Sequence, residues 1–136
     1  MRLLCGINIF INIFKIIIIH THTHTNMNIY VDIDGTITTK TEDINYNNAI
    51  PVYKNIEHIN KLYDNGFIIT YWTGRGTMTK IDWTDITKEQ LNKWGAKHHY
   101  LLMGKPAYDL FIDDKSINAI DYFNQFTNTT DNQRNF

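Results

Sequence analysis

The chain has very few of the residues that cross-link or interrupt a polypeptide. It contains one cysteine and two prolines in 136 residues, so it cannot form an internal disulfide and is not a disulfide-stapled secreted scaffold. Asn8, Asn12 and Lys15 interrupt its most hydrophobic stretch, which leaves it short of the roughly 20 apolar residues of a membrane-spanning helix. We therefore expect a cytoplasmic protein with no membrane partner.

Positive charge shows no excess either. Thirteen Lys and Arg residues stand against fourteen Asp and Glu residues, for a formal net charge of −1. Surfaces that bind duplex nucleic acid are usually basic, so we do not expect a duplex partner. The composition, with 43% hydrophobic and 20% charged residues, is that of an ordinary globular domain.

Residues 1–26 differ from the rest of the chain. They are rich in isoleucine and end in a His-Thr repeat, which is a low-complexity pattern. We interpret them as a leader upstream of a natural start at Met27, with an added strand or a membrane anchor as the alternatives. His20, His22 and His24 alternate in this repeat without an accompanying carboxylate or cysteine, so we do not assign them a metal site.

From residue 27 onward, apolar runs alternate with helical spacing. Strands are predicted at 28–34, 67–73, 98–103 and 110–112, and helices at 51–65, 87–94 and 116–123. Thr87 and Gln90 have capping-box spacing at the start of the second helix. This alternation predicts an α/β fold, specifically a Rossmann-like three-layer sandwich with a mainly parallel central sheet. We expect it to occupy residues 27–126, followed by a polar tail at 127–136.

Polar side chains follow several of these strands at the carboxyl end, where parallel sheets bind ligands. They are Asp32 and Asp34, then Thr73 with Gly74 and Arg75, then Lys105 in the turn before the last strand, then Asp113 and Asp114. A threonine hydroxyl and a glycine amide can hold a phosphate oxygen, and a lysine can neutralise an anion beside it. Clustered carboxylates need a cation, and oxygen ligands favour Mg²⁺.

The order of these motifs is more specific than any one of them. Asp-x-Asp, then Thr, then Lys, then Asp-Asp resembles the haloacid dehalogenase-like (HAD) phosphohydrolase superfamily over residues 28–123. Response-regulator receiver domains use similar residues in another order, with the lysine last. The layout of W-T-G-R-G, T-K-E-Q-L-N-K-W-G and G-K-P-A-Y-D-L-F-I-D-D-K-S is also similar to small microbial phosphatases associated with capsule or surface-sugar gene clusters.

The resemblance implies a role for each motif residue. Asp32 would be the nucleophile that forms an aspartyl-phosphate, and Asp34 would be the general acid and base. The remaining implied roles are phosphate binding by Thr73 and Lys105, and Mg²⁺ binding by Asp32, Asp113, Asp114 and the backbone carbonyl of Asp34. Gly74, through its amide, and Arg75, which directly follows this turn, are further candidates for contact with phosphate or substrate. The gaps between motifs leave no room for a cap domain. The site would therefore be open, unless a second copy of the chain or another subunit covers it.

We expect a Mg²⁺-dependent phosphomonoesterase that acts on a small phosphorylated metabolite, with a sugar phosphate favoured. Alternatives are a nucleic-acid or nucleotide phosphatase, a phosphotransferase or mutase that shares the aspartyl-phosphate, and an inert HAD-like binding partner. No basic track with interleaved aromatic residues supports the first alternative. No motif residue is missing, which argues against the last.

Overall fold

The computed structural model describes residues 27–41 and 43–127. The predicted leader, residues 1–26, and most of the predicted tail lie outside this range. None of the helices in the described part of the chain has the length and apolar character needed to span a bilayer.

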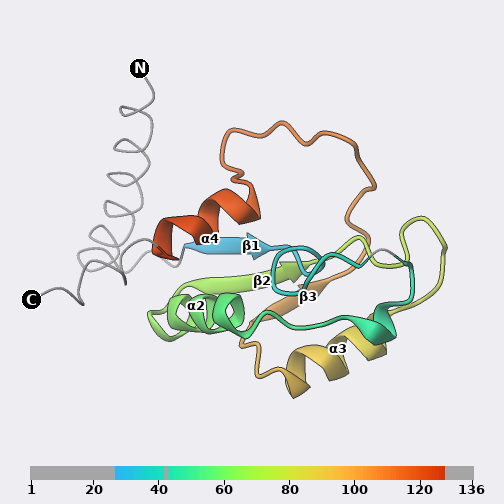
Figure 1. Cartoon of the computed structure of the whole chain (residues 1–136), viewed down its shortest axis with the longest axis horizontal. Helices are drawn as coiled ribbons and strands as arrows, with labels where there is room; N and C mark the ends of the chain where they lie inside the picture. The colour runs from blue at the N-terminus through green and yellow to red at the C-terminus, as the bar shows by residue number, and fades with distance from the viewer. Residues whose placement is uncertain (1–26, 42, 128–136) are drawn as a thin grey trace, which may run out of the picture.

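A three-stranded parallel sheet forms the centre of the fold (Figure 1). Its strands are β1 (Asn28–Val31), β2 (Ile68–Trp72) and β3 (Tyr100–Leu102), and they lie side by side in chain order. Tyr30 pairs with Thr70, and Thr70 pairs with Tyr100. Because all three strands run the same way, their carboxyl ends meet at one edge of the sheet.

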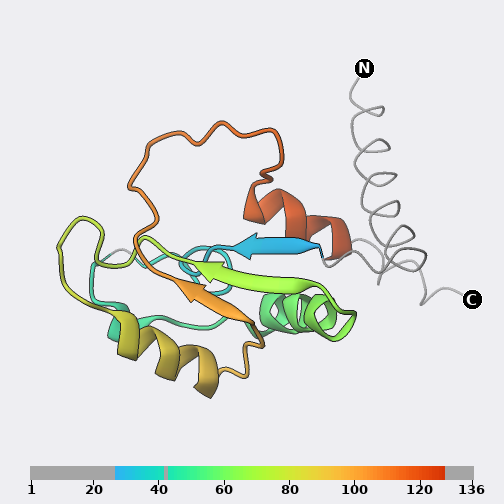
Figure 2. The same ribbon diagram turned by 180° about the vertical axis from the view of Figure 1, so that it is seen from behind.

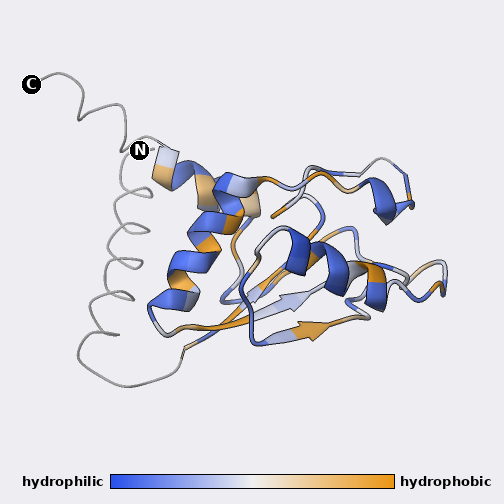
Figure 3. Ribbon diagram, turned by 90° about the horizontal axis from the view of Figure 1, so that it is seen from below, coloured by the Kyte–Doolittle hydropathy of each residue, from blue (hydrophilic) through white to orange (hydrophobic). Residues whose placement is uncertain are grey.

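Three helices pack on one side of this sheet (Figures 2 and 3). They are α2 (Tyr53–Asp64), α3 (Thr84–Lys93) and α4 (Ala119–Thr127), and a short 3₁₀ helix, η1 (Tyr46–Asn48), precedes α2. Right-handed crossovers between strands that follow chain order place α2 and α3 on the same face. Helix α4 contacts α2 through an interaction between the His58 ring and the Tyr122 hydroxyl.

The hydrophobic core lies between that sheet face and the helices. Ile69 and Tyr71 of β2 are fully buried there, and Ile56 of α2 and Leu91 of α3 are at most 1% exposed. Side chains alternate between the faces of a strand, so their neighbours in sequence point the other way. The described residues leave that second face without a helix, and Tyr30 and Tyr100 on it are each 61% exposed.

The α/β class and the parallel sheet are thus confirmed. The described residues form two layers rather than the three that we predicted. The likeness of this fold to a Rossmann-like arrangement rests on the parallel strands and their helical crossovers.

The predicted fourth strand at 110–112 is wrong. These residues belong to a long loop between β3 and α4 that swings away from the sheet (Figure 1). Leu110 is 74% exposed and Ile112 is 87% exposed, so their hydrophobicity does not reflect burial here. An apolar run of three residues makes no ladder on its own, and no described strand pairs with it.

The predicted capping box of the second helix is also wrong. Helix α3 begins at Thr84, three residues before Thr87, which is fully buried inside the helix. The Asp82 side chain instead accepts a hydrogen bond from the Thr84 N–H. Glycines follow α2 and α3 as expected, since Gly66 and Gly95 both have positive φ angles.

Candidate active site

Asp32 and Lys105 form an ion pair at the carboxyl edge of the sheet. Asp32 comes directly after β1, and its Oδ2 lies 3.0 Å from Lys105 Nζ. Its Oδ1 accepts a hydrogen bond of 2.8 Å from the Ile33 N–H. The Asp32 side chain stays 35% exposed, against 14% for Lys105, so the carboxylate remains accessible from solvent.

Aromatic rings flank the Lys105 ammonium. Its Nζ lies 5.9 Å from the centre of the Trp72 ring and 5.4 Å from that of Tyr108, within the range of cation–π attraction. Burial by itself lowers the pKa of Lys105, but the Asp32 charge and hydrogen bonds to Asp32 and Tyr108 outweigh it. The net pKa lies above the usual lysine value, so Lys105 is a cation at neutral pH.

Asp34 has a different partner. Arg75 Nε donates to Asp34 Oδ2, and Arg75 Nη2 donates to Asp34 Oδ1, both at 2.8 Å. This is the bidentate arrangement that arginine forms with carboxylates. The Thr38 hydroxyl also lies 3.4 Å from Asp34 Oδ1.

Arg75 is held from several other sides. Its Nη1 donates to the Thr87 hydroxyl at 3.1 Å and to Gln90 Oε1 at 2.6 Å. Its guanidinium carbon lies 4.9 Å from the centre of the Tyr46 ring. The Arg75 side chain is 0% exposed, so in this structure it faces the protein interior and not a substrate, in contrast to its predicted role.

The turn after β2 is tied to the turn after β3. The Thr73 hydroxyl accepts from the Arg75 N–H at 3.2 Å, and the Thr73 carbonyl accepts from the Lys105 N–H at 3.0 Å. The Thr77 hydroxyl donates to the Lys105 carbonyl at 2.8 Å. A Cβ on Gly74 would lie 3.3 Å from that same carbonyl oxygen, which explains why a glycine fits there.

Asp113 and Asp114 do not join this cluster. They lie in the exposed loop after β3, where Asp113 Oδ1 accepts from the Lys115 N–H at 2.7 Å. Among residues 27–41 and 43–127, no three metal-ligating side chains come close enough to hold an ion. The donor chemistry suits Mg²⁺, but the arrangement described here does not bring the four predicted ligands together.

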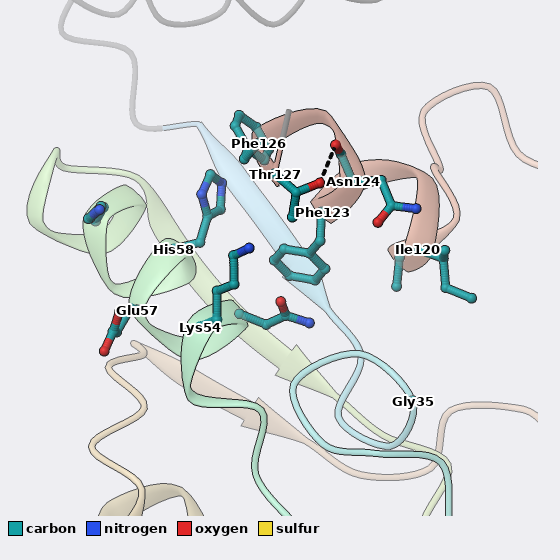
Figure 4. Close-up of a pocket in the computed structure, with 12 residues that line it drawn as sticks. Gly35, Lys54, Glu57, His58, Ile120, Phe123, Asn124, Phe126 and Thr127 are labelled. Carbon is teal, nitrogen blue, oxygen red and sulfur yellow. Dashed lines mark hydrogen bonds between the residues drawn. The ribbon is translucent and has the colours of Figure 1, made fainter. Parts of the chain in front are cut away.

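A cavity of about 450 Å³ lies between α2 and α4 (Figure 4). Lys54 and His58 of α2 and Phe123 of α4 line it, and Gly35 of the D-x-D-G-T loop stands at its rim. Neither Asp32 nor Lys105 lines it. The cavity therefore adjoins the candidate site and does not contain it.

The motifs at the strand ends do not identify the residues that surround Arg75. Tyr46, Thr87 and Gln90 are separated from Arg75 by 12 to 29 positions, and the sequence pattern assigns Gln90 to a capping box. Gln90 also donates from Nε2 to the Tyr46 carbonyl at 2.7 Å. A glutamine and a threonine three positions apart on α3 share a face, and that spacing was the available signal.

Comparison with known proteins supports the fold and goes no further. No family model matches the chain, and no curated protein matches it. It is similar to the crystal structure of a structural-genomics target from Vibrio cholerae, with a TM-score of 0.64 and 24% sequence identity. The match covers 79% of this chain and 99% of that one.

Proposed function

We propose that the chain is a capless HAD-type phosphomonoesterase that depends on Mg²⁺ and hydrolyses a small phosphorylated metabolite. The observation that carries the proposal is the Asp32–Lys105 ion pair at the carboxyl ends of parallel strands. Asp34, two residues after Asp32, forms a second ion pair with Arg75. A nucleophile and a proton-transfer group two residues apart suit phosphoryl transfer through a carboxylate.

In the first step, an Asp32 carboxylate oxygen attacks the substrate phosphorus. The bond between phosphorus and the leaving oxygen breaks, and Asp34 gives that oxygen a proton carried on the Oδ2 lone pair that Arg75 does not use. The products are an aspartyl-phosphate on Asp32 and a free alcohol.

In the second step, Asp34 takes a proton from a water molecule that attacks the aspartyl-phosphate. The bond between phosphorus and the Asp32 oxygen breaks, which releases inorganic phosphate and restores the Asp32 carboxylate. Asp34 returns to its protonated form for the next cycle.

Lys105 stabilises the negative charge that gathers during both steps. Its position at 3.0 Å from Asp32 allows it to contact a phosphoryl group attached there. The Thr73–Gly74 turn is bonded to Lys105 through the main chain and would hold phosphate oxygens beside it.

Mg²⁺ would offset the repulsion between the anionic nucleophile and the anionic substrate. Its proposed ligands are the carboxylates of Asp32, Asp113 and Asp114 and the backbone carbonyl of Asp34. Joint binding requires a course of the loop after β3 other than the one described, since Asp113 and Asp114 now stand apart from the other two.

The proposed substrate is a sugar phosphate or a similar small cytoplasmic metabolite. The Asp32 side chain is partly exposed, and Tyr108 beside Lys105 is 47% exposed. An open entrance of this kind also suits coverage by a second copy of the chain or by another subunit.

A phosphate-release screen tests the proposal. The purified chain is assayed on sugar phosphates, nucleotides and 5′- or 3′-phosphorylated oligonucleotides, with Mg²⁺ or with EDTA, and Asp32→Asn is the matched variant. We expect release that needs both Mg²⁺ and Asp32. Release that persists in Asp32→Asn or in EDTA would reject the mechanism. A folded chain that binds Mg²⁺ and releases phosphate from no substrate would favour an inert binding partner.

A further inference from the structure

We propose that Arg75 is a positioning residue, which holds the Asp34 carboxylate in the orientation needed for proton transfer. This inference rests on the proposed function, because it assigns Arg75 a part in the same reaction. It replaces the predicted contact between Arg75 and the substrate.

The geometry of the Asp34–Arg75 pair supports this role. Both oxygens of Asp34 accept from the same guanidinium, at 2.8 Å each. Two parallel hydrogen bonds fix the plane of a carboxylate as well as its distance. A lysine in the same place would supply the charge without fixing the plane.

Arg75 itself is fixed by its other partners. Thr87 and Gln90, both on α3, accept from its Nη1, and the Tyr46 ring of η1 packs against it. Gln90 also holds the Tyr46 carbonyl, so one side chain braces both the guanidinium and the segment that carries the ring. Helix α3 thereby sets the orientation of a carboxylate that follows β1.

The leaving group also decides how much the reaction needs a positioned proton donor. An alcohol is a poor leaving group and needs a proton as its bond to phosphorus breaks, whereas p-nitrophenolate leaves without one. A proton donor acts only when it is held within hydrogen-bond reach of the leaving oxygen. Loss of positioning should therefore slow the hydrolysis of alkyl phosphates more than that of p-nitrophenyl phosphate.

The experiment compares kcat/KM for p-nitrophenyl phosphate and for glycerol 2-phosphate. For each substrate, kcat/KM depends only on the steps up to departure of the leaving group. The later role of Asp34 as a base therefore does not affect kcat/KM. The variants are Arg75→Lys, which keeps the charge, and Gln90→Ala, which keeps Arg75 and removes one brace. Lys97→Gln is the control, because it breaks an exposed ion pair of the same 2.8 Å length with Asp64.

We expect Arg75→Lys to lower kcat/KM on glycerol 2-phosphate by about 10- to 100-fold, a part of what a general acid contributes. The fall on p-nitrophenyl phosphate should be about threefold or less. Gln90→Ala should show the same imbalance to a smaller degree, and Lys97→Gln should show none. In the Asp34→Asn background, Arg75→Lys should cause little further loss, because the two residues act as a unit.

Equal losses on both substrates would overturn the inference, and so would additive losses in the double variant. If Arg75→Lys fails to fold, Gln90→Ala decides the test, through a larger loss of kcat/KM on glycerol 2-phosphate than on p-nitrophenyl phosphate. A wild-type chain that is folded and inactive on both substrates would reject the proposed function itself, and the inference with it. A wild-type chain whose activity depends on Asp32, with variants that lose equally on both substrates, would reject the role of Arg75 and leave the proposed function standing.

Discussion

At the scale of single residues, the two carboxylates of the Asp-x-Asp pair are held in different ways. Asp32 meets a lysine, which is a compact charge on a flexible stem, and Asp34 meets an arginine, which is a rigid planar fork. The first arrangement leaves a partly exposed oxygen acceptor beside a cation. The second immobilises a carboxylate. A nucleophile needs access, and a proton-transfer group needs a fixed position, so the two partners suit the two proposed roles.

The Lys105 charge is the subject of the first prediction. Replacing Lys105 by Met keeps much of the side-chain volume and removes the cation that faces Asp32. We expect kcat for phosphate release to fall by about 100- to 1,000-fold, as for the loss of one group that stabilises transition-state charge. Steady-state assays measure this, with Lys97→Gln as the control. A fall smaller than about threefold would remove Lys105 from the proposed mechanism.

A second prediction compares two glycines with the same backbone angle. Gly76 has a φ of 78° and Gly104 a φ of 79°. A Cβ on Gly76 would collide with the Ile81 carbonyl, whereas a Cβ on Gly104 would meet nothing within 4 Å. Both changes to alanine carry the left-handed backbone cost of about 1–2 kcal/mol. Gly76→Ala should lose a further ~1–3 kcal/mol from the steric conflict.

Urea denaturation of the two glycine variants measures the difference in the free energy of unfolding. The shared φ angle cancels, so the difference between Gly76→Ala and Gly104→Ala reports the collision alone. Equal destabilisation by the two variants would show that the loop at residue 81 moves aside without cost.

Among the helices and strands, the sequence predicted those that have a clear local pattern of apolar residues. Strand β2 and helix α2 appeared at nearly the observed positions, because a buried apolar run and a 3.6-residue period are local signals. The segment 110–112 shows the limit of such signals. Three apolar residues predict a strand whether or not a neighbour pairs with them, and pairing is a property of the whole sheet.

The same limit applies to the candidate site. The Asp32, Asp34, Thr73 and Lys105 motifs could be found from their places at strand ends, and the structure brings Asp32 to Lys105. The bonds from Arg75 to Thr87 and Gln90 could not be found in this way. The spacing of Thr87 and Gln90 places them on one face of α3, but it does not show that this face lies against the turn after β2.

A third prediction concerns the contact between α2 and α4. Burial, and next the Lys61 charge, lower the pKa of His58 below the usual 6.5, and the His58 ring meets the Tyr122 hydroxyl at 3.0 Å. The unfolded chain therefore binds more protons than the folded one just below pH 6.5. Stability is retained above that pH and is lost as the pH falls from about 6.5 toward the lower folded pKa.

The measurement is the free energy of unfolding between pH 5 and pH 8 for the wild type and for His58→Gln. Groups other than His58 cancel in the difference between the two curves. We expect that difference to narrow as the pH falls below 6.5, because the variant has no proton to take up at this position. Parallel curves would show that the α2–α4 contact does not depend on the protonation of His58.

At the scale of the whole molecule, the described chain has an uncovered sheet face and a long loop that leaves the sheet. The Tyr30 and Trp72 rings on that face pack in a T-shaped, edge-to-face contact with their centres 6.2 Å apart. The loop exposes Leu110 and Phe111. The same loop carries Asp113 and Asp114. Its course therefore decides both how much apolar surface is covered and whether Asp113 and Asp114 can share an ion with Asp32 and the Asp34 carbonyl.

The last prediction tests whether Mg²⁺ fixes the course of this loop. If Mg²⁺ binds Asp32, the Asp34 carbonyl, Asp113 and Asp114 together, it binds the folded chain and not the unfolded one. Saturating Mg²⁺ should then raise the free energy of unfolding, by about 2.7 kcal/mol at a concentration 100 times the dissociation constant. It should also protect the main-chain amides of residues 104–118 from hydrogen exchange. The Asp113→Asn/Asp114→Asn variant should lose both effects, while Asp109→Asn, in the same loop, should keep them. Equal stabilisation of the Asp113/Asp114 variant by Mg²⁺ would show that the ion binds without this loop and that these two acids are not its ligands.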